Sequence, residues 1–285
     1  LTLTTSLSAA TALDGFTTSN LESFNASMAD AAAAAHTLTL NMATASADTV
    51  QVSGLGTSTA NDTVTFNNLA AGTTVAMRSA TDLNATANFV AAATAGTADS
   101  VSVELGGVSR TAATDVTLTI GTGFETLNID SSGSASRLDQ ITTTTATAIN
   151  VTGNANLTID TALDATTATV DASAFTGNLS IVTANDAAPN GTVGGVDIAD
   201  MTITGGSGND TLNVSAAAAN NELNINGGAG NDTVTVGTGA LAAATATNAG
   251  DTLVGGDGTD VLASTSAGLT AQSAAGTTGV SGFET

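Results

Sequence analysis

Short runs of strictly alternating polar and apolar residues recur along the chain. Two of them, Asn-Asp-Thr-Val-Thr-Phe at 61–66 and Asn-Asp-Thr-Val-Thr-Val at 231–236, share one phrase, and related runs follow Asp48, Asp99 and Asp210. Alternation with a period of two places every second side chain on one face. Each run therefore predicts a short β-strand that follows a turn aspartate and buries one of its faces.

A second phrase, Gly-Phe-Glu-Thr, occurs at 123–126 and again at 282–285, with a looser form at 20–26. The looser copy predicts a strand in the first half of the Ala-rich segment 20–36, and a short helix at 30–36 stays as an alternative. The apolar residues of this phrase, Phe124 and Leu127, are predicted to fill the interior of the fold.

Many short strands, frequent Gly and Asn turns and a single proline, Pro189, favour an all-β solenoid. We therefore predict a right-handed parallel β-helix or β-roll in which each coil contacts only its neighbours. Aromatic residues make up 2% of the chain, too few for the core of a typical sandwich, although a two-sheet sandwich remains an alternative. An interior lined by Val, Leu, Ile and Ala is sufficient for a solenoid.

The charge balance narrows the possible partners. The formal net charge is −22, with 25 Asp and Glu against three Arg and no Lys. Such a chain repels phosphate backbones and anionic lipid headgroups, so we expect neither nucleic-acid binding nor membrane insertion. Hydrophobic residues make up 42% of the chain, which predicts folding instead of disorder. Without cysteine there are no disulfides and no thiolate ligands for zinc, so oxygen ligands remain.

Three segments, beginning at Gly205, Gly227 and Gly255, match the nonapeptide G-G-x-G-x-D-x-U-x, in which U is a large apolar residue. Glycine permits tight turns that aim carbonyl oxygens inward, and the aspartate adds a carboxylate. A hard cation that takes six to eight oxygens needs two such turns stacked together. We therefore predict a calcium site, and no other cofactor, at Gly205, Gly206, Ser207, Gly208, Asn209, Asp210, Gly227, Gly228, Ala229, Gly230, Asn231, Asp232, Asp251, Gly255, Gly256, Asp257, Gly258 and Asp260.

The spacing of the nonapeptides makes this prediction specific. The second begins 22 residues after the first, close to one coil, which predicts that Asp210 and Asp232 lie on the same edge of successive coils. The third begins 28 residues after the second, so a loop through 239–250 is expected to protrude. At the exit of that loop, residues 249–253 are interpreted as a degenerate turn that contains Asp251.

The nonapeptides resemble the RTX repeats of proteins exported by type I secretion. Phrases at 123–128, 151–158 and 170–177 look like those of Caulobacter-type crystalline surface-layer proteins. The resemblance covers residues from about 120 to 285 and implies a calcium-dependent, self-assembling coat. It also implies that Asp210, Asp232 and Asp260 ligate calcium, together with carbonyls in 205–209, 227–231 and 255–259. In this chain the nonapeptides are separated and not tandem, unlike the family pattern.

No catalytic constellation is predicted, and we do not expect an enzyme. The single histidine, His36, is expected at the surface, and no base accompanies the abundant Ser and Thr. The glycine turns could cradle phosphate, but the aspartate in each copy would repel it.

These observations predict a secreted structural protein of a bacterial surface layer, or S-layer, that assembles with copies of itself. The alternatives are a stalk or RTX segment of a large adhesin and the calcium-binding tail of a secreted hydrolase. We expect solenoid coils with few calcium motifs at 1–204, calcium-binding coils at 205–264 and the start of a further repeat at 265–285. Both ends are expected to continue into a longer protein, through which the coat could contact cell-surface polysaccharide.

Overall fold

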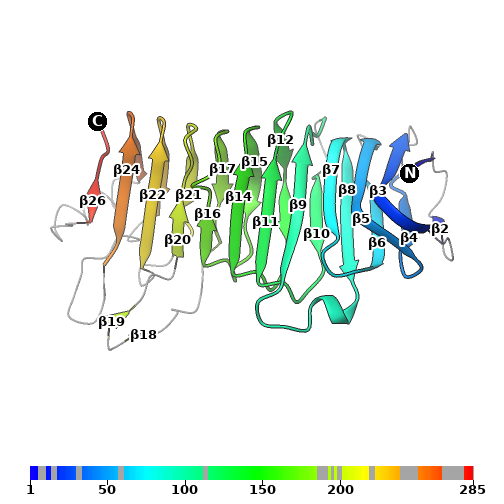
Figure 1. Cartoon of the computed structure of the whole chain (residues 1–285). Coiled ribbons are helices and arrows are strands. Elements are labelled where there is room, and N and C mark those ends of the chain that lie inside the picture. Colours follow the sequence, from blue (N-terminus) through cyan, green and yellow to red (C-terminus); the bar gives the residue numbers. More distant parts are fainter. Residues whose placement is uncertain are drawn as a thin grey trace. The chain divides into compact units, whose positions relative to one another are not determined.

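A computed structural model provides the structure of the chain (Figure 1). It describes residues 1–5, 11–13, 18–29, 34–56, 61–111, 115–184, 192–193, 196–197, 201–217, 222–237, 250–264 and 279–284. The chain divides into two compact units. The N-terminal unit comprises Leu1–Ala146 with Thr158–Asp160, and the C-terminal unit comprises Thr147–Leu157 with Thr161–Thr285. Each unit is a parallel β-solenoid.

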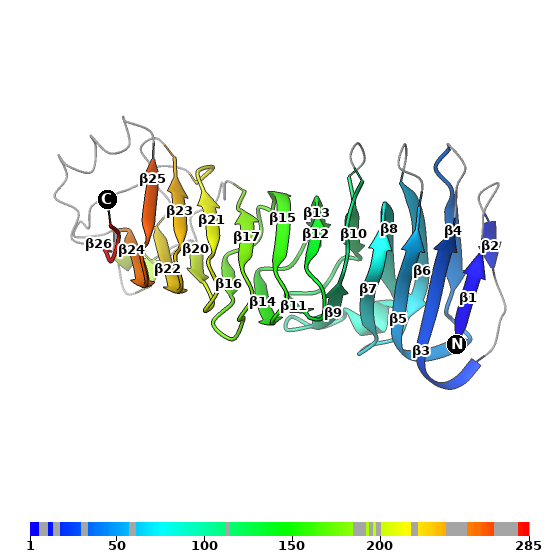
Figure 2. The same cartoon turned by 90° about the horizontal axis from the view of Figure 1, so that it is seen from above.

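In the N-terminal unit, strands from alternate sides of each coil form two sheets (Figure 2). The first contains β1 (Thr2–Thr5), β3 (Thr18–Ala29), β5 (Ala45–Leu55), β7 (Thr74–Thr81), β9 (Ser100–Gly106) and β11 (Thr126–Ser131). The second contains β2 (Thr11–Leu13), β4 (Thr37–Asn41), β6 (Asp62–Leu69), β8 (Leu83–Phe89), β10 (Thr117–Ile120) and β13 (Gln140–Thr142). This unit also includes β12 (Ser136–Leu138) and the 3₁₀ turn η1 (Ala91–Ala93).

The interior of this unit is built from columns of apolar side chains. Leu38 pairs with Val64, Val64 with Ala85, and Ala85 with Leu118, so residues of the same face stack from coil to coil. All four are buried. Since every pairing is parallel and shifts by one coil, the alternating pattern of each strand continues the same buried face.

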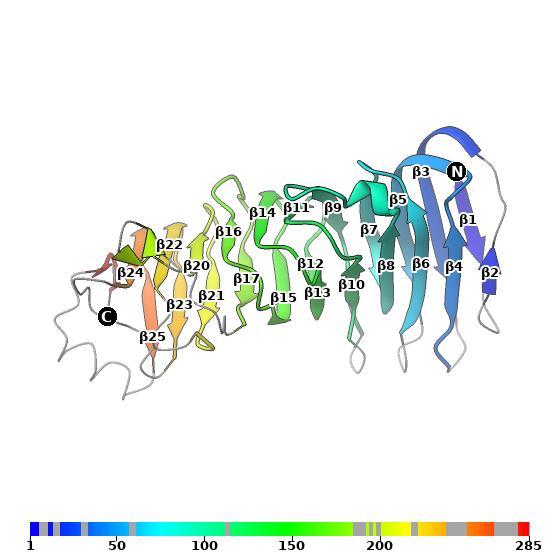
Figure 3. The ribbon, with the colours of Figure 1, turned by 90° about the horizontal axis from the view of Figure 1, so that it is seen from below.

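The C-terminal unit repeats the plan with shorter strands (Figure 3). One sheet contains β14 (Ala148–Gly153), β16 (Thr169–Asp171), β20 (Met201–Thr204), β22 (Leu223–Ala229), β24 (Thr252–Asp257) and β26 (Val280–Ser281). The other contains β17 (Leu179–Val182), β21 (Thr211–Val214), β23 (Thr233–Val236) and β25 (Val261–Ser264). The strand β15 (Leu157–Ala162) has residues in both units, and β18 (Thr192–Val193) pairs with β19 (Val196–Asp197) as an antiparallel hairpin.

The solenoid predicted from the sequence is confirmed, and the sandwich alternative is wrong. The strand predicted at the start of 20–36 is confirmed as part of β3, whereas the alternative helix at 30–36 lies partly outside the described residues. Phe124 and Leu127 are buried, as predicted. Among the helices in the described ranges, none is long and apolar enough to cross a membrane.

The compact units divide at 146/147, whereas the sequence prediction placed its first boundary at 204. That prediction followed the glycine motifs, and the compact units follow backbone contacts, which continue through coils with and without nonapeptides. Of the predicted terminal segment 265–285, the structure describes 279–284, and 265–278 lie outside the described residues.

Candidate metal centre

The three nonapeptides form stacked turns along one edge of the C-terminal unit. We call residues 205–210, 227–232 and 255–260 the first, second and third turns. They connect β20 to β21, β22 to β23 and β24 to β25. In the register, Thr211 pairs with Thr233 and Thr233 with Val261, so the residue after each turn aspartate lies beside its counterpart in the next coil. The predicted stacking of the turns is thus confirmed, although the predicted loop at 239–250 lies, apart from Gly250, outside the described residues.

The turn aspartates form a ladder of hydrogen bonds between coils. The Oδ1 atom of Asp210 accepts the Leu179 N–H at 2.8 Å. Asp232 Oδ1 accepts the Asp210 N–H, and Asp260 Oδ1 accepts the Asp232 N–H, each at 2.8 Å. All three aspartates are at most 1% exposed. Each carboxylate is therefore held inside the edge of the solenoid and does not extend into solvent.

The second carboxylate oxygen differs among the three aspartates. Asp210 Oδ2 accepts the Gly206 N–H at 2.8 Å. The Oδ2 atoms of Asp232 and Asp260 are buried and accept no hydrogen bond. A buried carboxylate oxygen without a partner is strongly destabilising, because the charge has lost its hydration and gained nothing in return. A bound cation would remove this cost.

Glycine is required beside these oxygens because the space is already filled. A Cβ atom added to Gly205 would lie 1.9 Å from the Gly227 carbonyl oxygen and 2.7 Å from Asp210 Oδ2. At Gly227 the same atom would lie 2.3 Å from the Gly255 carbonyl oxygen and 2.5 Å from Asp232 Oδ2. Each position brings a carbonyl oxygen of the next coil close to a carboxylate oxygen.

These donors suit calcium better than a transition metal. Ca²⁺ takes oxygen ligands and accepts backbone carbonyls alongside carboxylates. Within the ranges that the structure covers, no three His, Cys, Asp or Glu side chains lie close enough together to hold a metal ion by themselves. Most ligands must therefore be backbone carbonyls, and the glycine turns supply them. The residues present fit Ca²⁺, and Asp232 and Asp260 would hold it through their Oδ2 atoms.

A second ladder, of asparagines, was not predicted from the sequence. Asn178 Oδ1 accepts the Asn209 N–H, Asn209 Oδ1 accepts the Asn231 N–H, and Asn231 Oδ1 accepts the Thr259 N–H, at 2.8–2.9 Å. These bonds run to the following coil, whereas the aspartate bonds run to the preceding one. The sequence signal for this ladder is the Asn-Asp pair that both of the first two turns contain. In each pair, the Asn side chain bonds to the following coil and the Asp side chain bonds to the preceding coil.

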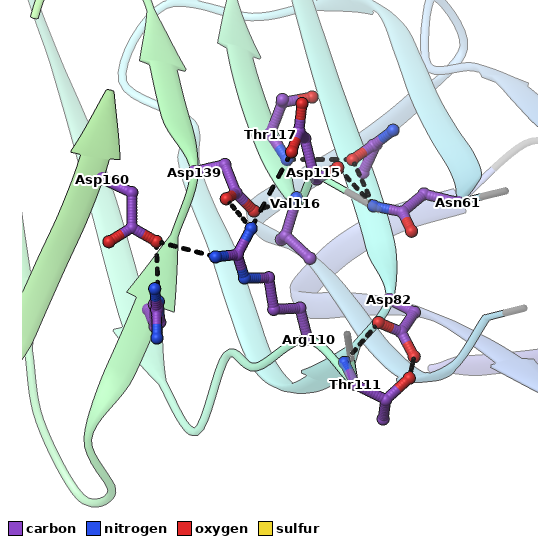
Figure 4. A network of polar contacts seen from close by, with 11 residues as sticks. Asn61, Asp82, Arg110, Thr111, Asp115, Val116, Thr117, Asp139 and Asp160 are labelled. Atoms are coloured by element: carbon purple, nitrogen blue, oxygen red, sulfur yellow. Dashed lines mark hydrogen bonds and ion pairs between the residues drawn. The ribbon is translucent and has the colours of Figure 1, made fainter. Parts of the chain in front are cut away.

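At Asp139, the N-terminal unit supplies the balancing cation from its own chain, as arginine (Figure 4). Asp139 Oδ2 accepts the Val116 N–H of the preceding coil at 2.6 Å, as the turn aspartates do, and its Oδ1 pairs with Arg110. Arg110 also lies 3.5 Å from an oxygen of Asp160, which in turn accepts the Arg137 Nε–H at 2.6 Å. The hydrogen bond and charge of Asp160 raise the pKa of Arg137.

The C-terminal unit has no such counter-charge. It contains twelve Asp and Glu residues and no Lys or Arg, because Arg78, Arg110 and Arg137 all belong to the N-terminal unit. A cation from outside the chain is therefore the available means of balancing the buried aspartates of this unit.

Two predicted site residues lie outside the buried row that Asp210, Asp232 and Asp260 form. Asp251 precedes β24 and its Oδ1 accepts the Leu223 N–H at 2.8 Å, whereas the third turn begins four residues later, about 13 Å along an extended strand. Asp257 belongs to the third turn, but it is exposed, and its carbonyl oxygen accepts the Gly230 N–H at 2.8 Å. Of the predicted side-chain ligands, Asp210, Asp232 and Asp260 are the ones that the structure places in one buried row, one in each of three successive coils.

His36, expected at the surface, is mostly covered in the structure. Its side chain is 10% exposed, and its backbone N–H donates to Asp62 Oδ1 at 2.7 Å. Asp62 is itself fully buried. The His36 Nδ1 atom also lies 3.7 Å from Asp62 Oδ1, a contact between coils that the local sequence does not reveal.

The pKa values of two aspartates in the row, Asp210 and Asp232, are raised. Burial raises the pKa of Asp210. Burial also raises the pKa of Asp232 to about 6, with further contributions from the charges of Asp210 and Asp260 and against the effect of the hydrogen bond from the Asp210 N–H. In the calcium-free chain, Asp232 is therefore protonated more readily than an ordinary aspartate.

Without calcium, we expect the free energy of unfolding of the C-terminal unit to increase as the pH is lowered from about 7 to about 5. The pKa of Asp232 is higher in the folded chain than the ordinary value of 3.8, so folding takes up a proton in this window. The stability gained from that proton is lost as the pH rises through the folded pKa. Urea unfolding in calcium-free buffer would measure it, with Asp232→Asn as the control that should flatten the slope. A steady loss of stability on acidification would contradict the prediction.

Comparison with known families supports the metal assignment. A family model described as the RTX calcium-binding nonapeptide repeat (4 copies) matches residues 202–216, 224–240 and 245–264. These segments contain all three turns. The comparisons with curated proteins and with solved structures each found no match. The C-terminal unit thus carries RTX calcium-binding repeats.

Proposed function

We propose that this chain is a calcium-loaded structural segment of a secreted protein, and that it assembles into a bacterial surface layer. The observation that carries the proposal is the pair of buried Oδ2 atoms of Asp232 and Asp260, which have no hydrogen-bond partner in a unit without Lys or Arg. These oxygens lie beside carbonyls of the adjacent coils. The chain acts through its fold, and we propose no catalytic role.

Calcium would act as a folding switch. Where calcium is scarce, as inside a cell, the acidic chain repels itself and stays unfolded enough for export. Outside, cation binding to the folded state supplies folding free energy by mass action. Extracellular calcium modules typically bind with Kd values of about 10⁻⁴–10⁻³ M, a range suited to such a switch.

Assembly follows from the same charge balance. At a net charge of −22, copies of the chain repel one another until cations reduce that charge. The phrases at 123–128, 151–158 and 170–177, which resemble surface-layer proteins, support a lattice as the assembled state. The sequence alternative, a stalk of an adhesin, uses the same calcium-stabilised coils without lateral association.

Electron microscopy of the purified chain before and after addition of calcium tests this function. Two-dimensional arrays that form with calcium and dissolve in chelator are the expected result. Particles that fold with calcium but stay separate at high concentration would overturn the surface-layer role and favour the stalk. The full reading frame would test the third alternative, since a catalytic domain in it would point to the tail of a secreted hydrolase.

A further inference from the structure

The turn at 282–284, which contains no nonapeptide, lies beside the third turn. In the register of β24 and β26, Leu253 pairs with Val280 and Val254 with Ser281, so the chain brings Gly282 next to Gly255. The Glu284 N–H then donates to the Asp260 carbonyl oxygen at 2.9 Å. The Gly-Phe-Glu phrase therefore continues the edge along which the three turns are stacked.

Glu284 extends the aspartate ladder by one step. Its Oε2 accepts the Asp260 N–H at 2.6 Å. This is the bond that Asp260 makes to Asp232 and that Asp232 makes to Asp210. The turn at 282–284 is shorter than a nonapeptide turn, and the longer glutamate side chain reaches the same N–H group of the preceding coil.

The carbonyl of Gly282 takes the place that a nonapeptide glycine takes in the earlier turns. A Cβ atom added to Gly255 would lie 1.8 Å from the Gly282 carbonyl oxygen and 2.6 Å from Asp260 Oδ2. The corresponding values at Gly227, given above, are 2.3 and 2.5 Å. Asp260 is 0% exposed, and its Oδ2 accepts no hydrogen bond. A buried anionic oxygen thus faces a carbonyl of the adjacent coil here too.

The other copy of the phrase shows that the phrase alone does not create this arrangement. At 123–125 the same backbone pattern occurs, since Glu125 Oε2 accepts the Asp99 N–H at 2.7 Å and the Glu125 N–H donates to the Asp99 carbonyl at 3.0 Å. Asp99, however, is partly exposed, and its Oδ2 accepts the Gly96 N–H at 2.7 Å. The carboxylate there is already satisfied, so the N-terminal copy provides a matched control.

We propose that the turn at 282–284 and the third turn together form a further calcium site at the end of the row. Asp260 Oδ2 and the Gly282 carbonyl oxygen face the ion, and Glu284 holds the turn in place and adds a second negative charge. Residues 282–284 lie outside the segments that match the RTX repeat. The inference rests on the proposed calcium binding and extends it to a turn without the nonapeptide motif.

Native mass spectrometry of the full chain, titrated with CaCl₂, tests the site by counting bound ions. In Glu284→Gln, a side-chain oxygen can still accept the Asp260 N–H but the charge is lost, and in Glu284→Ala both are lost. We expect Glu284→Gln to weaken the last ion to bind by about tenfold or more, because ligand charge tunes calcium affinity, and Glu284→Ala to bind one ion fewer than wild type. Glu125→Gln should match wild type.

The outcomes separate this inference from the proposed function. Wild-type protein that binds no calcium would overturn both. Calcium binding by wild type with equal ion counts and affinities in both Glu284 variants would overturn the terminal site alone. An equal loss in Glu125→Gln would also overturn it, because the effect would then belong to the phrase or to net charge. Hydrogen exchange of β21 and β23 in calcium checks that each variant is folded.

Discussion

Excess chelator is expected to lower the hydrogen-exchange protection of β20 to β25 strongly while β4 to β11 stay protected. The C-terminal unit buries Asp210, Asp232 and Asp260 without any Lys or Arg, whereas the N-terminal unit pairs Asp139 with Arg110. Calcium present at 100 times its Kd stabilises a one-site protein by about 2.7 kcal/mol, so loss of several ions removes a large share of the stability of one domain.

The same experiment contains its controls. Restoring calcium after chelation should restore protection, and magnesium should do so poorly because it dehydrates reluctantly and demands octahedral geometry. Unchanged protection of β20 to β25 in chelator would contradict the prediction. Equal loss in both units would contradict the idea that arginine replaces calcium in the N-terminal unit.

The effect of Asp232→Asn on the free energy of unfolding is expected to be opposite with and without calcium. Asparagine keeps an oxygen that can accept the Asp210 N–H but replaces the charged Oδ2. In saturating calcium, loss of one ion should lower the free energy of unfolding by about 3–4 kcal/mol. In chelator, the variant should be as stable as wild type or more stable, because the buried and unpaired charge is gone. Urea unfolding in the two conditions measures both effects.

Asp257→Asn is the matched control for this substitution. It makes the same charge change in the same row of turns, but Asp257 is exposed. A surface substitution of this kind should stay within about 0.5 kcal/mol in either condition. If Asp232→Asn destabilised the chain equally with and without calcium, Asp232 would be a structural residue and not a calcium ligand.

The fold could be predicted from the sequence because its determinants are local. Period-two alternation after a turn aspartate is visible in any one strand, and the scarcity of aromatic residues argues against a thick core. The spacing of 22 and 28 residues between the glycine motifs also predicted which turns stack, since Asp210, Asp232 and Asp260 lie in register.

The burial of acidic groups could not be predicted from the sequence. From the sequence alone, a turn aspartate is expected to be exposed to solvent. In the structure, the preceding coil donates a backbone N–H to it, as Leu179 does to Asp210 and His36 does to Asp62. The interaction of Arg110 with Asp139 and Asp160 likewise joins residues 29 to 50 positions apart. Such contacts depend on the length of each coil, which varies: Ala148 pairs with Thr169, but Thr169 pairs with Thr202.

The role of Glu284 at the candidate site could not be predicted from the sequence either. The sequence marked its phrase as a repeat with a buried phenylalanine, but the role of its carboxylate depends on the residue it meets. Asp260 has a free Oδ2 and Asp99 does not, and nothing within the Gly-Phe-Glu phrase distinguishes the two partners.

The central claim is that calcium ions lie between the stacked glycine turns, against the buried aspartates. A high-resolution crystal structure of the calcium-loaded chain, with anomalous data that identify calcium, tests it most directly. The account predicts anomalous peaks between adjacent turns, at about 2.3–2.6 Å from Asp232 Oδ2 and from carbonyl oxygens of the turns. Ordered turns at saturating calcium, with Asp232 Oδ2 buried and no peak beside it, would contradict the account.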